Sequence, residues 1–464
     1  MRRWNPLYWL DCGPGTQALG SSGGEREQVY QNPLAGYVGI SPGVCDTSRG
    51  ETAGGSDTAI ASGREANARK RYRVLIIAPT SFFADYGCHV RILVEALILQ
   101  RLGYEITIST YHTGEDIADL RIIRTSSIPW RRGYELGPSL HHIPFDLLLC
   151  LKSLTWALRH KPDIIHAHLH EGALIGYPLS RLCRAPLIFD FQGSLTGEMI
   201  DHGFLRCGSL FHNPLRQLEG LIDHLPRIII TSSRHAARLL RQEFDCHQKK
   251  IYLLPDGVNT DLFRPGGNRE EKSALKVRLG IPPQSRVVVY LGLLAEYQGI
   301  SLLLRAAGEL VDSYPDLHFL IMGYPNEDHY RALAAEMGMA GRVTFTGRIH
   351  YLEAPRYLNL GDVAVGPKIS ATEGSGKLPN YMAMALPTVA FDTAVSREYL
   401  GEYGVYARPR DYASLAEAIS SLLEDEGRAI SLGYKLRERA IELYSWPRLQ
   451  ETMKSIYSAL IGEG

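Results

Sequence analysis

The sequence lacks both an excess of charge and a long apolar run. Its 464 residues include 50 Lys and Arg and 50 Asp and Glu, and no long Lys/Arg run occurs, so the charge pattern indicates no nucleic-acid partner. No stretch reaches the roughly 18 apolar residues of a membrane-spanning helix, and the N-terminus lacks the apolar core of a signal peptide. We therefore expect a cytoplasmic, globular protein of two or three domains.

Cysteine pairs are missing as well. The seven cysteines lie between Cys12 and Cys246, and none belongs to a C-x-x-C pair. This pattern argues against a disulfide framework and against a structural zinc site built from paired cysteines, and it fits a reducing compartment.

Residues 1–70 differ in composition from the rest of the chain. They are rich in Gly, Ser, Thr and charged residues and show no sustained hydrophobic periodicity. We predict a disordered extension. A functional tail and a start codon assigned too far upstream both remain open, and no chemistry is assigned to this segment.

From Arg73 onward, apolar runs of strand length alternate with helical patterns. A run at 74–78 is followed by a helical pattern at about 90–102 and by a second run at 105–110, which predicts a parallel βαβ unit. The alternation continues, and it predicts one doubly wound domain over 71–264. Its further helices are expected at 145–160, 172–182 and 214–223, and its further strands at 163–167, 187–189 and 227–230.

A second series of the same kind follows the Pro/Gly-rich segment at 263–268. It predicts a second Rossmann-like domain over 265–445, and a last helix over 446–464. The expected helices lie at 269–279, 300–312 and 328–338, and the expected strands at 286–292, 318–322, 343–345 and 362–367.

The loop after the strand at 362–367 combines an acid, two glycines and a lysine. Glu373, Gly374, Gly376 and Lys377 precede Pro379, which suits a first helical turn. A helix start beside an ammonium favours an anion, whereas a carboxylate accepts hydrogen bonds from sugar hydroxyls. The loop therefore suits a phosphorylated sugar. An ordinary strand–turn–helix connection with a solvated acid and a surface cation is the other interpretation.

Three histidines alternate where the strand at 163–167 ends: His166, His168 and His170. A continued strand would place them on one face, which opens a metal-site interpretation. No cysteine or matched carboxylate pair is near in the sequence, and bonding to backbone groups in a loop is the alternative. The polar segment at 190–196 after the next strand, which includes Gln192, suits either acceptor binding or a capped loop.

Taken together, these segments resemble the retaining glycosyltransferases of family 4, which have the GT-B fold. The resemblance covers about 73–460. It is carried by Pro255-Asp256-Gly257-Val258-Asn259, similar to the family's hinge segment, by Phe345-Thr346-Gly347-Arg348, by the loop and helix from Glu373 to Val389, and by Tyr444-Ser445-Trp446 before the last helix.

The resemblance implies two Rossmann-like domains facing a cleft, with the last helix packing back toward the first. It also implies transfer of a sugar from a nucleotide-diphosphate donor to a glycan, lipid or small-molecule acceptor with retention. No metal or cofactor is implied, and the chain has no D-x-D pair. His168, near the reacting carbon, and Glu373 are the implied catalytic residues. Donor contacts are expected from Gly292, Arg348, Gly374, Ser375, Gly376, Lys377, Leu378 and Asn380, and acceptor contacts from Gly87, Cys88, His89, His170 and Gln192.

The chain departs from the family pattern at three positions. Leu293 and Gln298 stand where the family has an Arg and a Lys that grip the donor diphosphate, and Asn380 stands nearest to a glutamate that holds the ribose. Hydrogen bonds to charged groups contribute about 1.5 to 3 kcal/mol each, so the missing cations require compensation, for which Lys377 and Arg348 are the candidates. A non-catalytic GT-B subunit, and a GT-B epimerase or phosphorylase, remain alternatives.

The predicted helix at 145–160 is strongly apolar and has basic neighbours. Peripheral contact with an anionic membrane is one interpretation, and burial as a crossover helix is the other. The basic residues are Arg131, Arg132, Lys152, Arg159 and Lys161.

Overall fold

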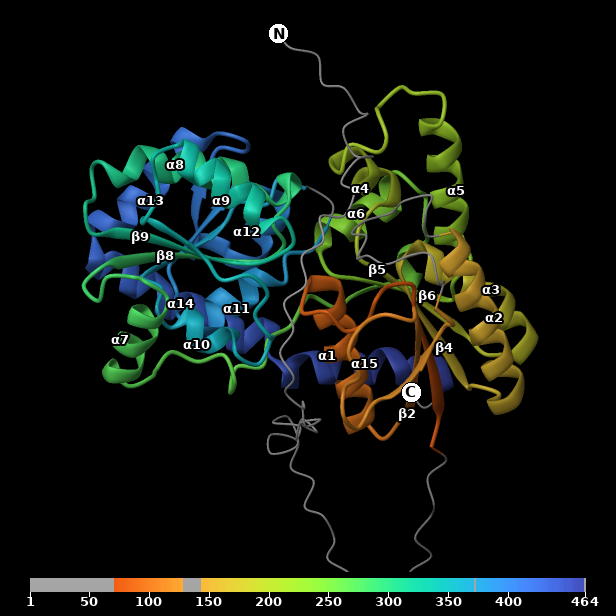
Figure 1. The fold of residues 1–464 in the computed structure, drawn as a ribbon. Helices are drawn as coiled ribbons and strands as arrows, with labels where there is room; N and C mark the ends of the chain where they lie inside the picture. The colour runs from red at the N-terminus through yellow and green to blue at the C-terminus, as the bar shows by residue number, and fades with distance from the viewer. Residues whose placement is uncertain (1–70, 128–142, 371–372, 463–464) are drawn as a thin grey trace, which may run out of the picture. The chain divides into compact units, whose positions relative to one another are not determined.

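The computed structural model describes residues 71–127, 143–370 and 373–462, which form two parallel sheets covered by helices (Figure 1). The expected extension at 1–70 and the basic residues Arg131 and Arg132 lie outside the described residues. The α/β fold class expected from the alternating pattern is confirmed. The predicted domain boundaries stay a prediction.

The first sheet has seven strands in the order β3-β2-β1-β4-β5-β6-β7. Its central strand β1 is apolar from Val74 to Ala78 because helices cover both faces of a parallel sheet. The direction of the strand order reverses between β1 and β4, where Val74 pairs with both Ile106 and Ile164. The strands are β1 Arg73–Ala78, β2 Glu105–Thr110, β3 Arg121–Arg124, β4 Ile164–His168, β5 Leu187–Phe191, β6 Ile228–Thr231 and β7 Ile251–Leu253.

Six α-helices connect these strands, and their apolar side chains fill the first core. Leu75, Ile165, Phe189 and Ile229 from the strands pack there with Trp156. The helices are α1 Gly87–Arg101, α2 Ile143–His160, α3 Leu169–Cys183, α4 Leu195–Asp201, α5 His212–His224 and α6 Arg234–Gln242.

Helix α2 has one buried apolar face and one exposed apolar face. One face buries Leu149, Trp156 and Ala157. The other face exposes more than half of each of its apolar side chains, Ile143, Leu147, Leu151 and Leu158. No helix among the described residues is both long enough and apolar enough to cross a membrane.

The second sheet has six strands in the order β10-β9-β8-β11-β12-β13, and its order reverses between β8 and β11. Tyr290, Phe319, Val365 and Val389 lie in its core. The strands are β8 Arg286–Leu291, β9 Leu317–Met322, β10 Val343–Phe345, β11 Val363–Gly366, β12 Thr388–Phe391 and β13 Val405–Ala407. The α-helices are α7 Arg269–Arg278, α8 Ile300–Val311, α9 Glu327–Glu336, α10 Ala354–Leu358, α11 Lys377–Ala383, α12 Ala394–Leu400, α13 Tyr412–Glu424 and α14 Glu426–Tyr444.

The last helix, α15 (Trp446–Ile461), packs against α1. Tyr457 shares a hydrogen bond of 2.8 Å with Nδ1 of His166 at the end of β4. Its ring also meets that of Tyr104, with the ring centroids 5.1 Å apart. The end of the chain thus contributes to the first core.

Candidate active site

A cavity of about 360 Å³ lies at the carboxyl ends of strands from both sheets. In open parallel sheets, ligands bind outside the strand ends where the order reverses. Pro79 after β1 and His170 after β4 line it from the first sheet, and Gly292 after β8 and Lys368 after β11 line it from the second. Both reversal points therefore open onto the same space.

Glu373 lies on the wall of this cavity between two basic side chains. Its Oε2 is 2.5 Å from Nζ of Lys368, and its Oε1 is 3.6 Å from Nε2 of His202. Burial alone would raise the pKa of Glu373, but Lys368 and His202 outweigh it and lower the pKa to about 2. Glu373 is thus an anion held in place, which is what a hydroxyl-binding carboxylate requires.

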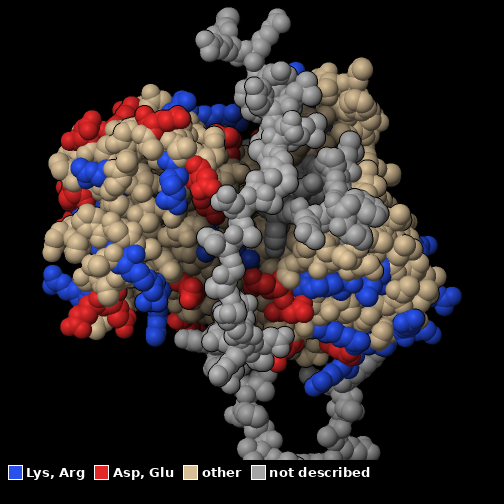
Figure 2. Space-filling model, in the orientation of Figure 1, with Lys and Arg blue, Asp and Glu red and all other residues tan. Residues whose placement is uncertain are grey.

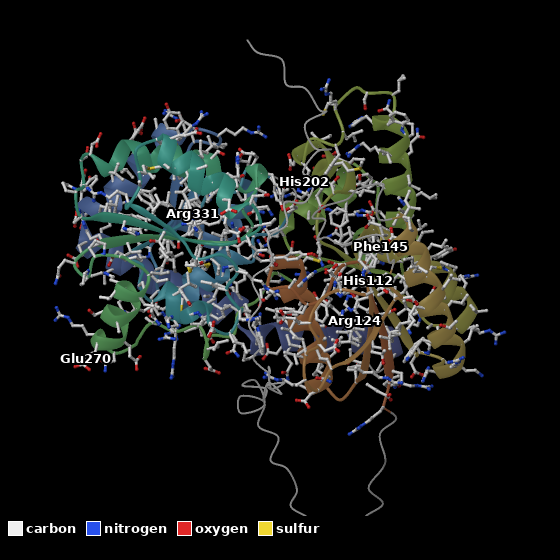
Figure 3. The ribbon with its side chains drawn as sticks, in the orientation of Figure 1. His112, Arg124, Phe145, His202, Glu270 and Arg331 are labelled. Atoms are coloured by element: carbon white, nitrogen blue, oxygen red, sulfur yellow. The ribbon has the colours of Figure 1, made fainter. Side chains whose placement is uncertain are left out.

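His202 follows the short helix α4, which Ser194 caps by accepting a hydrogen bond from the amide of Gly197. The imidazole packs against Tyr297, with the ring centroids 4.0 Å apart and the ring planes tilted by 39°. The contact with Tyr297 positions His202 beside Glu373. In Figure 3, His202 is labelled, as are His112 and Phe145, which lie elsewhere near the first sheet and whose stacked rings have centroids 5.5 Å apart.

A second acid, Glu198, lies next to Glu373. A Cβ added to Gly193 would lie 2.3 Å from Oε1 of Glu198 and 3.1 Å from Cγ of Glu373. Burial, reinforced by the charge of Glu373, raises the pKa of Glu198 well above its usual value. The close approach of the two acids therefore requires glycine at position 193.

Lys377 is the first residue of α11, and its side chain lies beside the end of β8. Its Nζ donates a hydrogen bond of 2.9 Å to Oε1 of Gln298 and lies 4.2 Å from the centre of the Tyr290 ring. A Cβ on Gly292 would come within 2.8 Å of the same Nζ. The hydroxyl of Tyr381 fixes α11 against this strand by accepting from the Leu291 amide at 2.7 Å.

The charge state of Lys377 depends on its surroundings. Burial, and then the charge of Lys368, lower the pKa of Lys377 well below its usual value. A buried amine without an anionic partner loses its proton readily, and a bound anion reverses that effect.

The loop between Glu373 and α11 is drawn close to the first sheet. A Cβ on Gly374 would lie 2.6 Å from Oδ2 of Asp256, and the Gly374 carbonyl accepts from Nζ of Lys368 at 2.6 Å. Ser375, Gly376 and Asn380 also line the cavity. The predicted donor residues from 374 to 377 and Asn380 are therefore brought together on one wall.

The structure does not bring Leu378 or Arg348 onto that wall. Leu378 is buried, and its amide donates to the Ser375 carbonyl at 2.9 Å. Arg348 pairs through Nε and Nη2 with Oδ2 of Asp85, at 2.9 and 2.6 Å, and through Nη2 with Glu115 at 2.9 Å. Its predicted donor role has no support from this position.

On the first-sheet side, the expected acceptor residues divide in the same way. Gly87, Cys88, His170 and Gln192 line the cavity. His89 is fully buried, with Nε2 2.5 Å from the Thr80 hydroxyl. Burial raises the pKa of the Cys88 thiol well above its usual value. The thiol therefore stays protonated and forms a neutral part of the cavity wall, because only a thiolate acts as a nucleophile.

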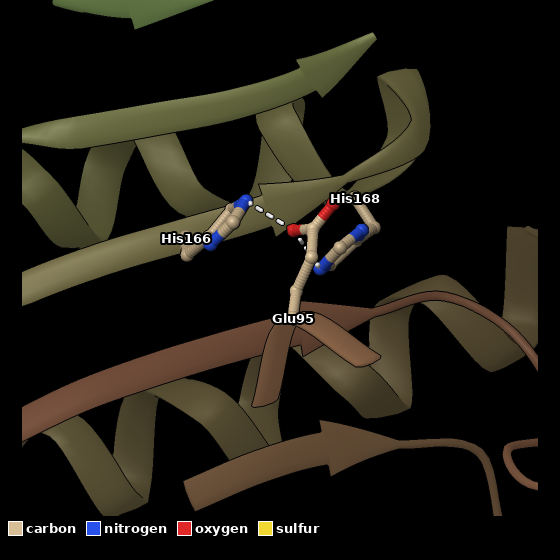
Figure 4. A group of neighbouring side chains, drawn as sticks. All are labelled: Glu95, His166 and His168. Carbon is tan, nitrogen blue, oxygen red and sulfur yellow. Dashed lines mark ion pairs between the residues drawn. The ribbon is translucent and has the colours of Figure 1, made fainter. Parts of the chain in front are cut away.

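His168, the expected catalytic histidine, lies in a buried polar network behind the cavity wall. Its Nδ1 is 2.9 Å from Oδ2 of Asp190, which also accepts from Nε of Arg91 at 2.8 Å. Its Nε2 and that of His166 face Oε2 of Glu95, at 3.9 and 3.4 Å (Figure 4). His168 is fully buried, so a direct contact with substrate stays a prediction.

Sequence reasoning missed Lys368, His202 and Tyr297, all of which line the cavity. A signal existed for Lys368, because it is a cation two residues beyond β11 and so belongs at the same sheet edge as the glycine loop. His202 and Tyr297 meet only through the fold, and no spacing in the sequence connects them.

Two family models match most of the described chain. Residues 87–262 match the model described as Glycosyltransferase Family 4, and residues 285–425 match the model described as Glycosyl transferases group 1. The D-inositol 3-phosphate glycosyltransferase of Corynebacterium glutamicum is 25% identical over 399 residues, covering 81% of this chain and 92% of the relative. The enzyme of the same name from Mycobacterium tuberculosis is 26% identical over 404 residues, covering 81% and 79%.

Solved structures with similar folds span nearly the same region. Sucrose-phosphate synthase from Thermosynechococcus elongatus superposes with a TM-score of 0.72 at 20% identity, covering 85% of this chain and all of that chain. Anabaena HepE in complex with UDP-glucose superposes with a TM-score of 0.66 at 15% identity, covering 83% and 99%. These likenesses show the GT-B fold.

Proposed function

Because the chain belongs to glycosyltransferase family 4, we propose that it transfers a sugar from a nucleotide-diphosphate donor to an acceptor in the same cavity. The relatives named as glycosyltransferases and the UDP-glucose in the HepE structure support a donor of this class. Retention of the anomeric configuration and independence from metal belong to the proposal.

One observation carries the proposal: an anchored anion and a lysine at opposite ends of one loop line the same cavity. Glu373 is held by Lys368 and His202, whereas the hydrogen-bond partner of Lys377 among the described residues is the neutral Gln298. A carboxylate suits sugar hydroxyls and an ammonium suits a diphosphate. A nucleotide sugar carries both groups on adjoining atoms, so it satisfies both ends of the loop.

In the proposed reaction, the bond between the anomeric carbon and the diphosphate oxygen breaks, and the acceptor oxygen bonds to that carbon on the same face. The acceptor proton passes to the departing diphosphate. Lys377 stabilises the charge that develops on the leaving oxygen. Glu373 and the backbone of Gly374 and Gly376 orient the donor sugar, and Asn380 binds the ribose.

The acceptor enters over the first sheet in this scheme. Cys88, His170 and Gln192 line that side of the cavity, and Gln192 is itself fixed by a 3.0 Å hydrogen bond to Asp190. These side chains suit an acceptor with hydroxyl groups, in a glycan, a lipid or a small molecule.

Incubation of the purified protein with uridine, guanosine and adenosine diphosphate sugars tests the proposal. We expect transfer or slow hydrolysis with one donor class, and product NMR should show the anomeric configuration of the donor. Glu373→Gln should abolish turnover, whereas the exposed Glu336→Gln on α9 should not. A protein that turns over no donor and binds no nucleoside diphosphate would contradict the proposal and favour a non-catalytic subunit. Formation of an epimeric nucleotide sugar in the absence of an acceptor would identify an epimerase.

A second part of the proposal concerns location: the first domain docks on an anionic membrane. Beside the exposed face of α2, Leu174 and Leu182 on α3 and Leu221 on α5 are more than half exposed, and Leu210 and Phe211 before α5 are 92% and 72% exposed. Helices α2 and α3 pack together, as do α3 and α5, so these side chains belong to neighbouring elements of the first domain. An apolar surface of this kind marks an interaction site.

Exposed basic residues border the same surface. Lys152, Arg159 and Lys161 lie on or just after α2, and Arg181 and Arg184 lie at the end of α3. Figure 2 shows Lys and Arg gathered at the lower right, where Figure 1 places these helices. Basic residues around an apolar face favour an anionic lipid surface.

Vesicle flotation tests this part separately. We expect binding to vesicles that contain phosphatidylglycerol and weak binding to phosphatidylcholine alone. Phe211→Glu should reduce binding, whereas Ile430→Glu, on an exposed apolar residue of α14, should not. Equal flotation of all three proteins would contradict membrane docking without affecting the donor proposal.

A further inference from the structure

A cluster of buried ionisable side chains lies behind the acceptor side of the cavity, between α3 and α5. Nε2 of His170 is 3.4 Å from Oδ1 of Asp223 and 3.9 Å from Oε1 of Glu219. Glu219 and Asp223 are four residues apart on α5 and therefore share a face of the helix. Both acids are fully buried, and the His170 side chain is 6% exposed.

Four polar atoms of this cluster have no hydrogen-bond partner within the described part of the chain. They are Nε2 of His170, Oε1 of Glu219 and both carboxylate oxygens of Asp223. The other oxygen of Glu219 does have partners, because it accepts from the amide and the hydroxyl of Thr196. Buried polar atoms are nearly always hydrogen-bonded. Here these atoms meet in long ion pairs of 3.4 and 3.9 Å between His170 and the two acids, which indicates room for a ligand between them.

The charges of the cluster do not balance either. Even with its proton, His170 supplies one positive charge against two carboxylates. Arg216 comes near, but it donates to the Thr196 hydroxyl at 3.3 Å and to Glu243, and not to Glu219 or Asp223. Buried charges in proteins are paired or coordinate a metal.

We propose that His170, Glu219 and Asp223 bind one divalent transition-metal ion, with Zn²⁺ the ion that suits them best. Zinc binds imidazole nitrogen and carboxylate oxygen at about 2.0 to 2.2 Å, which places tetrahedral ligand atoms roughly 3.4 Å apart. The three ligand atoms already lie within 4.8 Å of one another. The imidazole disfavours Mg²⁺ and Ca²⁺, which prefer all-oxygen sites.

The neighbouring cluster of Glu95, His166 and His168 is a weaker candidate. The His166 and His168 rings are stacked with only 17° between their planes, so the lone pairs on their nitrogens lie in nearly parallel planes, which disfavours convergence on one ion. Arg91 lies 3.2 Å from Glu95 and supplies its counter-charge. The three alternating histidines therefore do not form one cluster in the structure. His166 and His168 face Glu95, whereas His170 faces α5.

The ion would have a structural role in the acceptor wall. His170 lines the cavity, whereas Glu219 and Asp223 do not. A metal that joins them fixes the start of α3 to the middle of α5 and so fixes His170. This role is separate from breakage of the donor bond and holds whether or not the proposed transfer occurs.

Calorimetric titration of the chelator-treated full chain with ZnCl₂ tests the proposal, with elemental analysis for stoichiometry. We expect one Zn²⁺ per chain in the wild type. Asp223→Asn and Glu219→Gln should each weaken binding at least about tenfold. Glu243→Gln, which changes an exposed acid beside the cluster, should bind as the wild type does.

Thermal unfolding is an independent measurement, in which the difference in melting temperature between variant and wild type should change sign between chelator and Zn²⁺. In chelator, Asp223→Asn removes one of two like charges and should melt at or above the wild-type temperature, whereas in Zn²⁺ the wild type should melt higher. The absence of Zn²⁺ binding by the wild type, or equal binding by the wild type and both variants, would overturn the proposal. If one variant fails to fold, the other provides the same comparison.

Discussion

The ammonium of Lys377 donates a hydrogen bond of 2.9 Å to the side-chain oxygen of Gln298. Gln298 is the residue that stands where the resemblance to family 4 leads one to expect a lysine. The space beside Gly292 is therefore occupied by an amine from α11 and not by one from the connection after β8. A single cation in this place would allow the chain to hold the proposed donor diphosphate although both expected cations are absent.

Proton uptake should accompany diphosphate binding. The pKa of Lys377 is lowered by burial in the empty site, and a bound diphosphate raises it again. Below both pKa values the affinity is independent of pH, and between them it falls as the pH rises, because binding takes up a proton in that window. Calorimetry in two buffers of different ionisation enthalpy should show uptake of up to one proton. The absence of proton uptake across the pH range would contradict a lowered pKa of Lys377 before the ligand binds.

Gln298→Glu should weaken diphosphate binding. The new carboxylate would compensate the positive charge of Lys377 and repel the diphosphate. We expect a loss of affinity of at least about tenfold, or 1.4 kcal/mol. The folded protein should tolerate the change, because the acid gains an ion pair in place of a hydrogen bond. Gln298→Ala is the matched variant and should lose less affinity, since it removes only the positioning contact. Unchanged affinity in Gln298→Glu would place the diphosphate elsewhere.

Gly193→Ala should impair sugar transfer more than nucleotide binding. The added methyl group would displace Glu198 and Glu373, and overpacking of this kind costs about 1 to 3 kcal/mol. The rate of transfer should fall at least about tenfold if that energy is lost in the transition state, while diphosphate affinity stays near the wild-type value. Gly427→Ala on α14, where a Cβ meets only an aspartate oxygen at 3.7 Å, is the control. Equal effects of both variants would argue against a role for the paired acids.

Arg348→Ala should lower stability and spare donor binding. It removes the guanidinium partner of the 2% exposed Asp85 side chain, which keeps a hydrogen bond from the Tyr351 amide. Hydrogen bonds to charged groups contribute about 1.5 to 3 kcal/mol each. A lower melting temperature with unchanged diphosphate affinity is the expected result. A large loss of affinity with an unchanged melting temperature would instead return Arg348 to the donor site.

Much of the fold was predictable because its strands are buried on both faces. The runs at β1 and β8 are continuously apolar and β2 alternates isoleucine with polar residues, so the existence and type of these strands follow from the sequence alone. The short edge strands β3, β7 and β13 and the polar helices α6 and α12 went unpredicted, since their pattern is set by contacts with neighbours and not by periodicity.

The candidate site was predictable where it lies within one stretch of sequence. The loop from Glu373 to Lys377 contains its own glycines, acid and cation. Pairings between residues far apart in the sequence were not predictable. Arg348 follows a strand end, as the donor residues do, but its guanidinium pairs with Asp85 in the first domain. His168 likewise follows the family pattern, yet Asp190 and Glu95 hold it inside the first domain.

The most direct test of the account is the affinity of Lys377→Met for a nucleoside diphosphate, measured by calorimetry beside the wild type. Methionine keeps the length of the side chain and removes its charge. Because a hydrogen bond to a charged group contributes about 1.5 to 3 kcal/mol, we predict a loss of roughly 10- to 150-fold together with loss of the proton uptake. The exposed Lys454→Met on α15 should bind normally. Wild-type affinity in Lys377→Met would contradict the claim that this single lysine anchors the donor diphosphate.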